Sequence, residues 1–246
     1  MDFEKVEYYD NLEMGYVSNL SGGFISKNTH IFKKIELNAL NKFVLEKSIY
    51  GTPIFKLGSG GKKILLLSGI HGNELPSQIA NIRLLNEMSN KRINNTLFFI
   101  PFAAPKASME NRRFFNARDL NRVAHIENSL SNEIIKKILE LDIDFVGDFH
   151  STAFNSNPGV ESIFSTKSPT PESFLIANYI AADVKCKSIS LDFAGESYKG
   201  AVEDVCNIKG IPAITAEVLS PFSSVAEGSV ERSLLQMKSF LSYFGI

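Results

Sequence analysis

The stretch KKILLLSGIHGNELPSQIA, residues 62–80, decides how the rest of the chain is interpreted. Its apolar run, 64–67, is typical of a strand that is buried on both faces. Helical spacing of apolar residues follows, and Pro76 is compatible with a first helical turn. His71 and Glu74 stand between these two segments, three residues apart, so that both side chains can face one point. An imidazole and a carboxylate at the end of a buried strand predict a functional site there.

Further apolar segments of strand length alternate along the chain with segments of helical periodicity. The predicted strands are 64–68, 97–101, 145–150, 161–164, 188–191 and 213–218, and the predicted helices are 74–88, 131–141, 172–184, 202–208 and 231–244. This alternation predicts an α/β sandwich with a largely parallel sheet. Ligands of such sheets bind at the carboxyl ends of strands, and both His71 and His150 fall at such ends.

Composition limits the class of protein. With 246 residues, 44% of them hydrophobic, we expect one catalytic domain over 1–246, in which 1–45 form an N-terminal wrapping segment of strand and loop. The net charge of −1 gives no electrostatic signal for nucleic acid or an anionic membrane. No apolar run approaches the roughly 20 residues of a membrane span, and the N-terminus lacks the apolar core of a signal peptide. Cys186 and Cys206 indicate two reduced thiols. We therefore expect a cytoplasmic protein.

Two of the four histidines belong to a candidate metal site. His71, Glu74 and His150 would leave one position of a tetrahedral zinc open, as a catalytic site requires, although a His-x-x-Glu pattern is frequent by chance. A ligating imidazole usually donates its other N–H to a carboxylate, and Asp119 and Asp148 are candidates for this role. Asp148 lies on the same strand face as His150. An equally good interpretation makes Asp148 a strand-end carboxylate exposed to water.

An ordered series of motifs resembles the zinc carboxypeptidase superfamily, particularly its succinylglutamate desuccinylase/aspartoacylase-like branch. The matching pieces are SIYGTPI (48–54), GIHGNE (69–74), RDLNR (118–122), DFHS (148–151), SYKG (197–200) and GIPAITAEV (210–218). The resemblance implies an α/β/α sandwich around a mixed eight-stranded sheet. That branch typically carries a further C-terminal β-rich region, whereas only 29 residues follow Glu217 here. In length the chain is similar to compact murein-peptide amidases of the same superfamily.

The resemblance also implies roles for individual residues. His71, Glu74 and His150 would hold one Zn²⁺ per chain. Asp119 would orient His71, and Asn121 and Arg122 would receive the free carboxylate of the substrate. Glu217 would act on the water that the metal activates.

Three positions of this comparison leave alternatives open. The arginine that polarises the scissile carbonyl is Arg112, Arg113 or Arg118, and its distance from the motif favours Arg113. Tyr198 is similar to a tyrosine that closes over substrate, although its separation from Glu217 is shorter than in the peptidases. Glu203 falls in the region of the specificity pocket, where an acid would favour an amine-bearing side chain; otherwise it faces solvent on a helix.

The chemistry of these residues fits hydrolysis of an amide. Zinc lowers the pKa of a bound water from about 15.7 to about 7, and a carboxylate in apolar surroundings, such as Glu217, can take up the released proton. Arg122 can bind a carboxylate through two parallel hydrogen bonds. We therefore predict a zinc-dependent hydrolase that cleaves an amide next to a free carboxylate in a small molecule or short peptide. The alternatives are a carboxypeptidase or murein-peptide amidase proper, and a non-catalytic carboxylate-binding module.

Overall fold

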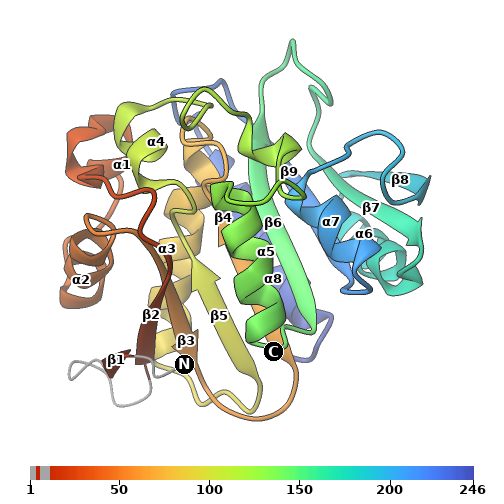
Figure 1. Ribbon diagram of the computed structural model, residues 1–246, viewed down its shortest axis with the longest axis horizontal. Helices are drawn as coiled ribbons and strands as arrows, with labels where there is room; N and C mark the ends of the chain where they lie inside the picture. The colour runs from red at the N-terminus through yellow and green to blue at the C-terminus, as the bar shows by residue number, and fades with distance from the viewer. Residues whose placement is uncertain (1–3, 6–11) are drawn as a thin grey trace.

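The computed structural model describes residues 4–5 and 12–246, and these form one mixed sheet covered by helices (Figure 1). The strands are β1 (Glu4–Lys5), β2 (Leu12–Ser18), β3 (Thr52–Leu57), β4 (Lys63–Ser68), β5 (Thr96–Ile100), β6 (Phe145–Thr152), β7 (Ser162–Ser168), β8 (Lys187–Phe193) and β9 (Ala213–Leu219). The α-helices are α1 (Thr29–Phe32), α2 (Ala39–Lys47), α3 (Leu75–Ser89), α4 (Pro105–Glu110), α5 (Leu130–Glu140), α6 (Pro171–Val184), α7 (Val202–Ile208) and α8 (Ser229–Ser242). Two 3₁₀ turns, η1 (Ile25–Lys27) and η2 (Leu120–Arg122), complete the described elements.

The strand order is β1-β2-β3-β5-β4-β6-β9-β7-β8. Pairing is parallel in the centre, from β5 through β4 and β6 to β9, and again between β7 and β8. It is antiparallel where β1, β2 and β3 extend one side, and between β9 and β7. The sheet is therefore mixed, with its longest parallel block in the middle.

Alternating side chains of the central strands enter two separate cores. Ile64 and Leu66 of β4 belong to the core that also includes α3, α6 and α8, whereas Leu65 and Leu67 belong to the core beneath α4, α5 and α7. The strand is buried on both faces because helices cover both (Figure 1). The predicted α/β/α sandwich is thus confirmed. Within the described chain, no helix is both long and apolar enough to cross a membrane.

All six predicted strands and all five predicted helices are present, with ends that differ by a few residues. β7 is the largest extension, because it continues to Ser168 beyond the predicted 161–164. The described sheet has nine strands, one more than the eight that the resemblance implies. Parallel pairing is also less extensive than predicted, since half of the neighbouring pairs are antiparallel.

The segment 1–45 contains more regular structure than its sequence predicts. Its residues 1–3 and 6–11 lie outside the described part of the chain. The rest supplies an edge of the sheet, two helices and the short η1 turn. Asn38 precedes helix α2, and its side chain caps the first turn by accepting a hydrogen bond from the backbone N–H of Asn41.

The register of the central strands brings the candidate site residues to one edge and one face of the sheet. His150 of β6 lies opposite Glu217 of β9, and Asp148 lies opposite Thr215. These four side chains share the face that α5 and α7 cover, because they alternate with residues of the other core. β4 pairs with β6 and ends at Ser68, three residues before His71.

Candidate metal centre and adjoining pocket

The turn between β4 and α3 presents His71 and Glu74. The backbone N–H of Glu74 donates to the carbonyl of His71 at 3.2 Å, which closes the turn. Gly72 lies against α4 so closely that a Cβ atom there would overlap the backbone of Ala107 and Ser108. Gly69, with a φ of +77°, lets the chain leave β4 in a left-handed conformation. The two side chains are therefore fixed by backbone geometry and are almost completely buried.

His150 completes a group of three potential metal ligands. Its Nδ1 lies 2.8 Å from Oε2 of Glu74, and Nδ1 of His71 lies 2.8 Å from Oε1 of the same carboxylate. One ligand atom from each residue falls within 4.8 Å of the others, and all three residues are buried. Three side chains from two distant segments thus converge on one point.

A second carboxylate lies behind each imidazole. Nε2 of His71 is 2.8 Å from Oδ1 of Asp119, and Nε2 of His150 is 2.9 Å from Oδ2 of Asp148. Asp148 is fully buried, so the sequence-based alternative of a water-exposed carboxylate is wrong. Both rings direct Nδ1 towards Glu74 and Nε2 towards an aspartate, which is the orientation of ligating histidines.

The electrostatics of this group indicate that positive charge is required. Burial alone would raise the pKa of Glu74, yet the adjacent His71 and His150 hold it well below its usual range. Burial opposes the charge of His150, yet Asp148 and Glu74 hold its pKa well above its usual range. The buried carboxylates of Glu74 and Asp148 therefore favour positive charge between them. Two imidazoles and one carboxylate are ligands that zinc favours, so the donor set fits this ion.

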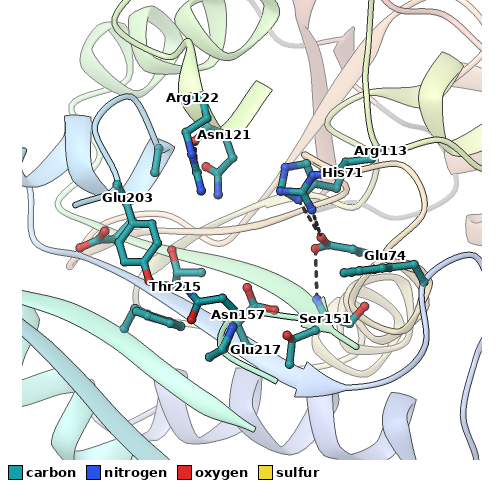
Figure 2. A pocket seen from close by; sticks show the side chains of 16 residues that line it. His71, Glu74, Arg113, Asn121, Arg122, Ser151, Asn157, Glu203, Thr215 and Glu217 are labelled. Atoms are coloured by element: carbon teal, nitrogen blue, oxygen red, sulfur yellow. Dashed lines mark hydrogen bonds and ion pairs between the residues drawn. The ribbon is translucent and has the colours of Figure 1, made fainter. Parts of the chain in front are cut away.

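Glu217 lines the same pocket as His71 and Glu74 (Figure 2), and the strand register places it opposite His150. Its Oε2 is buried and has no hydrogen-bond partner in the described structure. Burial and the negative charge of Glu74 raise the pKa of Glu217 to about 8. An unpaired buried carboxyl group with a pKa near neutrality is suited to accept and return a proton.

Of the three candidate arginines, the structure brings only Arg113 to the site. Its guanidinium donates to Oε1 of Glu74 at 3.1 Å and to Oδ2 of Asp119 through two hydrogen bonds. Arg112 and Arg118 are exposed and do not line this pocket. Burial alone would raise the pKa of Asp119, but His71 and Arg113 hold it well below its usual range.

Asn121 and Arg122 form another wall of the pocket, on the η2 turn (Figure 2). The Asp119 side chain caps this turn by accepting from the backbone N–H of Asn121 at 3.0 Å. Oδ1 of Asn121 accepts from the backbone N–H of Val202 at 3.1 Å, so its side chain is tied to the start of α7. Gly200, with a φ of +86°, packs against the carbonyl of Arg122.

Tyr198 and Glu203 line the end of the pocket near α7. The Tyr198 ring packs edge-on against Phe164 with centroids 5.4 Å apart, and the Arg122 guanidinium lies 5.5 Å from the ring centroid. Asn157 donates to the Tyr198 hydroxyl at 3.4 Å. Glu203 is 5% exposed and lines the pocket, so the alternative in which it faces solvent is wrong.

Several pocket residues have no place in the sequence-based prediction. Thr215 lies two residues before Glu217 on one strand, so strand periodicity would have placed it on the same face. Ser151 follows His150 directly, and its backbone N–H donates to Oε2 of Glu74 at 3.2 Å. Asn157 and Phe222 come from loops, where no periodicity marks them.

Comparisons with known proteins identify the family and the fold of the chain. The model of the succinylglutamate desuccinylase/aspartoacylase catalytic domain family matches residues 60–208. No curated protein matches significantly in sequence. An aspartoacylase family protein from Mesorhizobium loti has a similar structure, with a TM-score of 0.65, 18% identity, and coverage of 100% of this chain and 69% of that one.

Two other solved structures share the fold. A succinylglutamate desuccinylase/aspartoacylase from Rhodobacter sphaeroides has a TM-score of 0.65 and 16% identity, and the match covers 100% of this chain and 67% of that one. A metallo-carboxypeptidase from Burkholderia cenocepacia has a TM-score of 0.61 and 13% identity, with coverage of 79% and 61%. At these identities the likeness establishes the fold.

Proposed function

The chain belongs to the succinylglutamate desuccinylase/aspartoacylase catalytic domain family, and from that premise we propose that it is a zinc-dependent amide hydrolase. Its substrate carries a free carboxylate next to the scissile amide. One observation carries the proposal: Glu217, with an unpartnered carboxyl oxygen, lines the same pocket as His71 and Glu74 and lies opposite His150, the third member of the ligand group.

In this proposal His71, Glu74 and His150 hold the zinc, and Asp119 and Asp148 fix the orientation of the two imidazoles. The bound metal supplies a Lewis acid that makes water nucleophilic near neutral pH. Glu217 takes up the proton of the attacking water and returns it to the leaving amine. Its raised pKa allows both transfers, because the group is neither a strong acid nor permanently protonated near pH 8.

The remaining polar residues bind and orient the substrate. Arg122 and the amide nitrogen of Asn121 receive the carboxylate, since the amide oxygen of Asn121 is already occupied by Val202. Arg113 lies beside Glu74, where its charge stabilises negative charge that develops on the scissile carbonyl oxygen. Tyr198 closes the side of the pocket opposite the ligands. Fixing the carboxylate places the adjacent amide beside Glu217, which is a proximity effect.

The test compares the zinc-loaded and the chelated protein on two substrate panels, N-acetyl and N-succinyl amino acids in one and dipeptides in the other. We expect hydrolysis that disappears with chelation and returns when zinc is restored. Preference for acyl amino acids would place the chain with the deacylases, and preference for peptides would place it with the carboxypeptidases or murein-peptide amidases. Turnover that persists in the metal-free protein would contradict the proposal, as would inactivity of the zinc-loaded protein on both panels.

A further inference from the structure

The pocket continues beyond the metal ligands to a second acidic group, Glu203 on α7. Figure 2 shows Glu203 on the opposite side of the pocket from His71 and Glu74, with Asn121, Arg122 and Thr215 between them. Glu203 is not a member of the ligand group, which consists of His71, Glu74 and His150 among the described residues. The presence of a buried acidic side chain at this end of the pocket therefore requires a separate explanation.

Glu203 is held in place but has no cationic partner in the described structure. Its Oε1 accepts from Nδ2 of Asn207 at 2.6 Å, and the same nitrogen also donates to the carbonyls of Glu203 and Ala213. No hydrogen bond or ion pair satisfies Oε2 among the described residues. A glutamate that is 5% exposed and has no cationic partner is rare in a folded protein, because burial of an uncompensated charge is strongly unfavourable.

The neighbours of Glu203 add negative charge. Asp204 follows it on α7, is 1% exposed, and has one carboxylate oxygen without a partner. Burial first, and then the charge of Asp204, raise the pKa of Glu203 to about 8. Asp148 acts on Glu203 in the same direction. This end of the pocket therefore disfavours an anion and would be stabilised by a cation.

Apolar and aromatic side chains form part of the walls that lead to Glu203, beside the polar Asn121, Arg122 and Thr215. Phe164, Tyr198 and Ala201 line the pocket, and the two rings pack edge-to-face. Aliphatic methylene groups would pack against such walls while a terminal ammonium group met the carboxylate. The aromatic faces would also attract a cation.

We propose that Glu203 selects substrates whose carboxylate-bearing amino acid has an amine-bearing side chain, such as lysine, ornithine or 2,4-diaminobutyrate. The inference rests on the proposed function, since it assumes that Arg122 and Asn121 hold the α-carboxylate. With that group fixed, the amide points towards Glu217 and the side chain towards Glu203. Nα-acyl derivatives of basic amino acids are then the substrate class, rather than derivatives of aspartate or glutamate.

The test measures binding and turnover separately on zinc-loaded protein. Calorimetry with free lysine, ornithine, 2,4-diaminobutyrate, norleucine, glutamine and glutamate gives affinity without catalysis. The Nα-acetyl and Nα-succinyl derivatives of the same amino acids give kcat/KM. We expect at least one amine-bearing member to exceed norleucine and glutamate in both measurements by about 10- to 100-fold, the range of a buried charge-assisted hydrogen bond.

Glu203→Gln keeps the size of the side chain and an oxygen for Asn207 while removing the charge. It should abolish the preference for the amine, so that the ratio of kcat/KM between the lysine and norleucine derivatives falls by about 10- to 100-fold, towards one. Asp204→Asn is the matched control: it removes a charge one residue away, from a side chain that does not line the pocket, and should retain the preference.

The results distinguish failure of the proposed hydrolase function from failure of the inference about Glu203. If no acyl amino acid or peptide is hydrolysed, the proposed function is wrong. The role of Glu203 is then tested by the affinities for the free amino acids alone. If turnover occurs but norleucine, glutamine or glutamate derivatives are equal or better substrates, the inference about Glu203 is overturned while the hydrolase remains. Equal affinity for lysine and norleucine, absence of binding by every amino acid, or an unchanged preference in Glu203→Gln would overturn it as well.

Discussion

At the scale of single residues, two carboxyl groups in one pocket have the same raised pKa but different surroundings. Glu217 borders the buried ligand group, and Glu203 borders the apolar walls near α7. In both, burial is the largest cause of the shift to about 8. Their tasks differ because Glu217 can reach the reacting atoms beside the metal ligands, whereas Glu203 can reach only a substrate side chain.

Glu217→Gln tests the first of these tasks. We expect turnover to fall by about 10²- to 10⁴-fold, because an amide cannot accept the proton that the carboxylate takes up. Bound zinc, measured by atomic absorption, should remain at one ion per chain, since Glu217 is not one of the three ligands. The control is Glu227→Gln, an exposed acid outside the pocket, which should leave both quantities unchanged. Loss of zinc in the Glu217 variant would mean that this carboxylate holds the metal instead.

The raised pKa of Glu203 predicts a pH dependence of stability in the chelated protein. The folded state keeps this proton up to about pH 8, whereas the unfolded chain releases it near the ordinary value of 4.5. Between these values the folded state binds more protons, so the free energy of unfolding falls as pH rises. Urea unfolding of wild type and Glu203→Gln should therefore differ by an amount that changes by up to about 1.4 kcal/mol per pH unit within this window. A difference independent of pH would mean that Glu203 is ionised in the folded protein.

At the scale of elements, the turn between β4 and α3 depends on its contact with α4. Because a Cβ at position 72 would overlap the α4 backbone, Gly72→Ala must displace one of these two segments. Displacement moves His71 and Glu74 relative to His150, so we expect zinc affinity to fall by about tenfold or more, as with other changes around metal ligands. Competition for zinc between the protein and a chromogenic chelator measures this affinity.

Gly210→Ala is the control for Gly72→Ala. Gly210 also requires a glycine-like conformation, with a φ of +81°, but a Cβ there would meet no atom within 4 Å. Its substitution should lower stability by about 1 kcal/mol through backbone strain while zinc affinity stays unchanged. If both variants bound zinc like the wild type, the contact with α4 would not be what fixes the ligands.

Elements that bury their residues on a regular period are predictable from this sequence. The strands around Leu66 and Ile214 are mostly apolar, and α5 is amphipathic and capped by Ser129. β2, β3 and α2 were not predicted from the sequence. β2 alternates buried and half-buried residues without a clear apolar signal, and α2 is held by its Asn38 cap and by packing on α3 rather than by a strong pattern.

At the scale of the whole molecule, the candidate site was predictable where it depends on strand ends. His71 and His150 end neighbouring parallel strands, and the register places Glu217 opposite His150. The resemblance of GIHGNE and RDLNR to a known family supplied the roles that strand ends alone do not give. The sequence did not predict the side of the pocket formed by Asn157 and Phe222, because loop conformation depends on contacts between segments distant in the chain.

Because the three ligands come from two segments about 80 residues apart, metal binding should be linked to folding of the whole chain. An ion that binds only the folded state raises the free energy of unfolding, by about 2.7 kcal/mol when free zinc is 100 times its Kd. We therefore expect the melting temperature of the chelated protein to rise continuously as zinc is added. His150→Ala should abolish this rise, whereas His30→Ala, at an exposed position in α1, should retain it. If zinc did not change the melting temperature of the wild type, these three side chains would be excluded as zinc ligands. An ion that binds a site present only in the folded state must raise the free energy of unfolding.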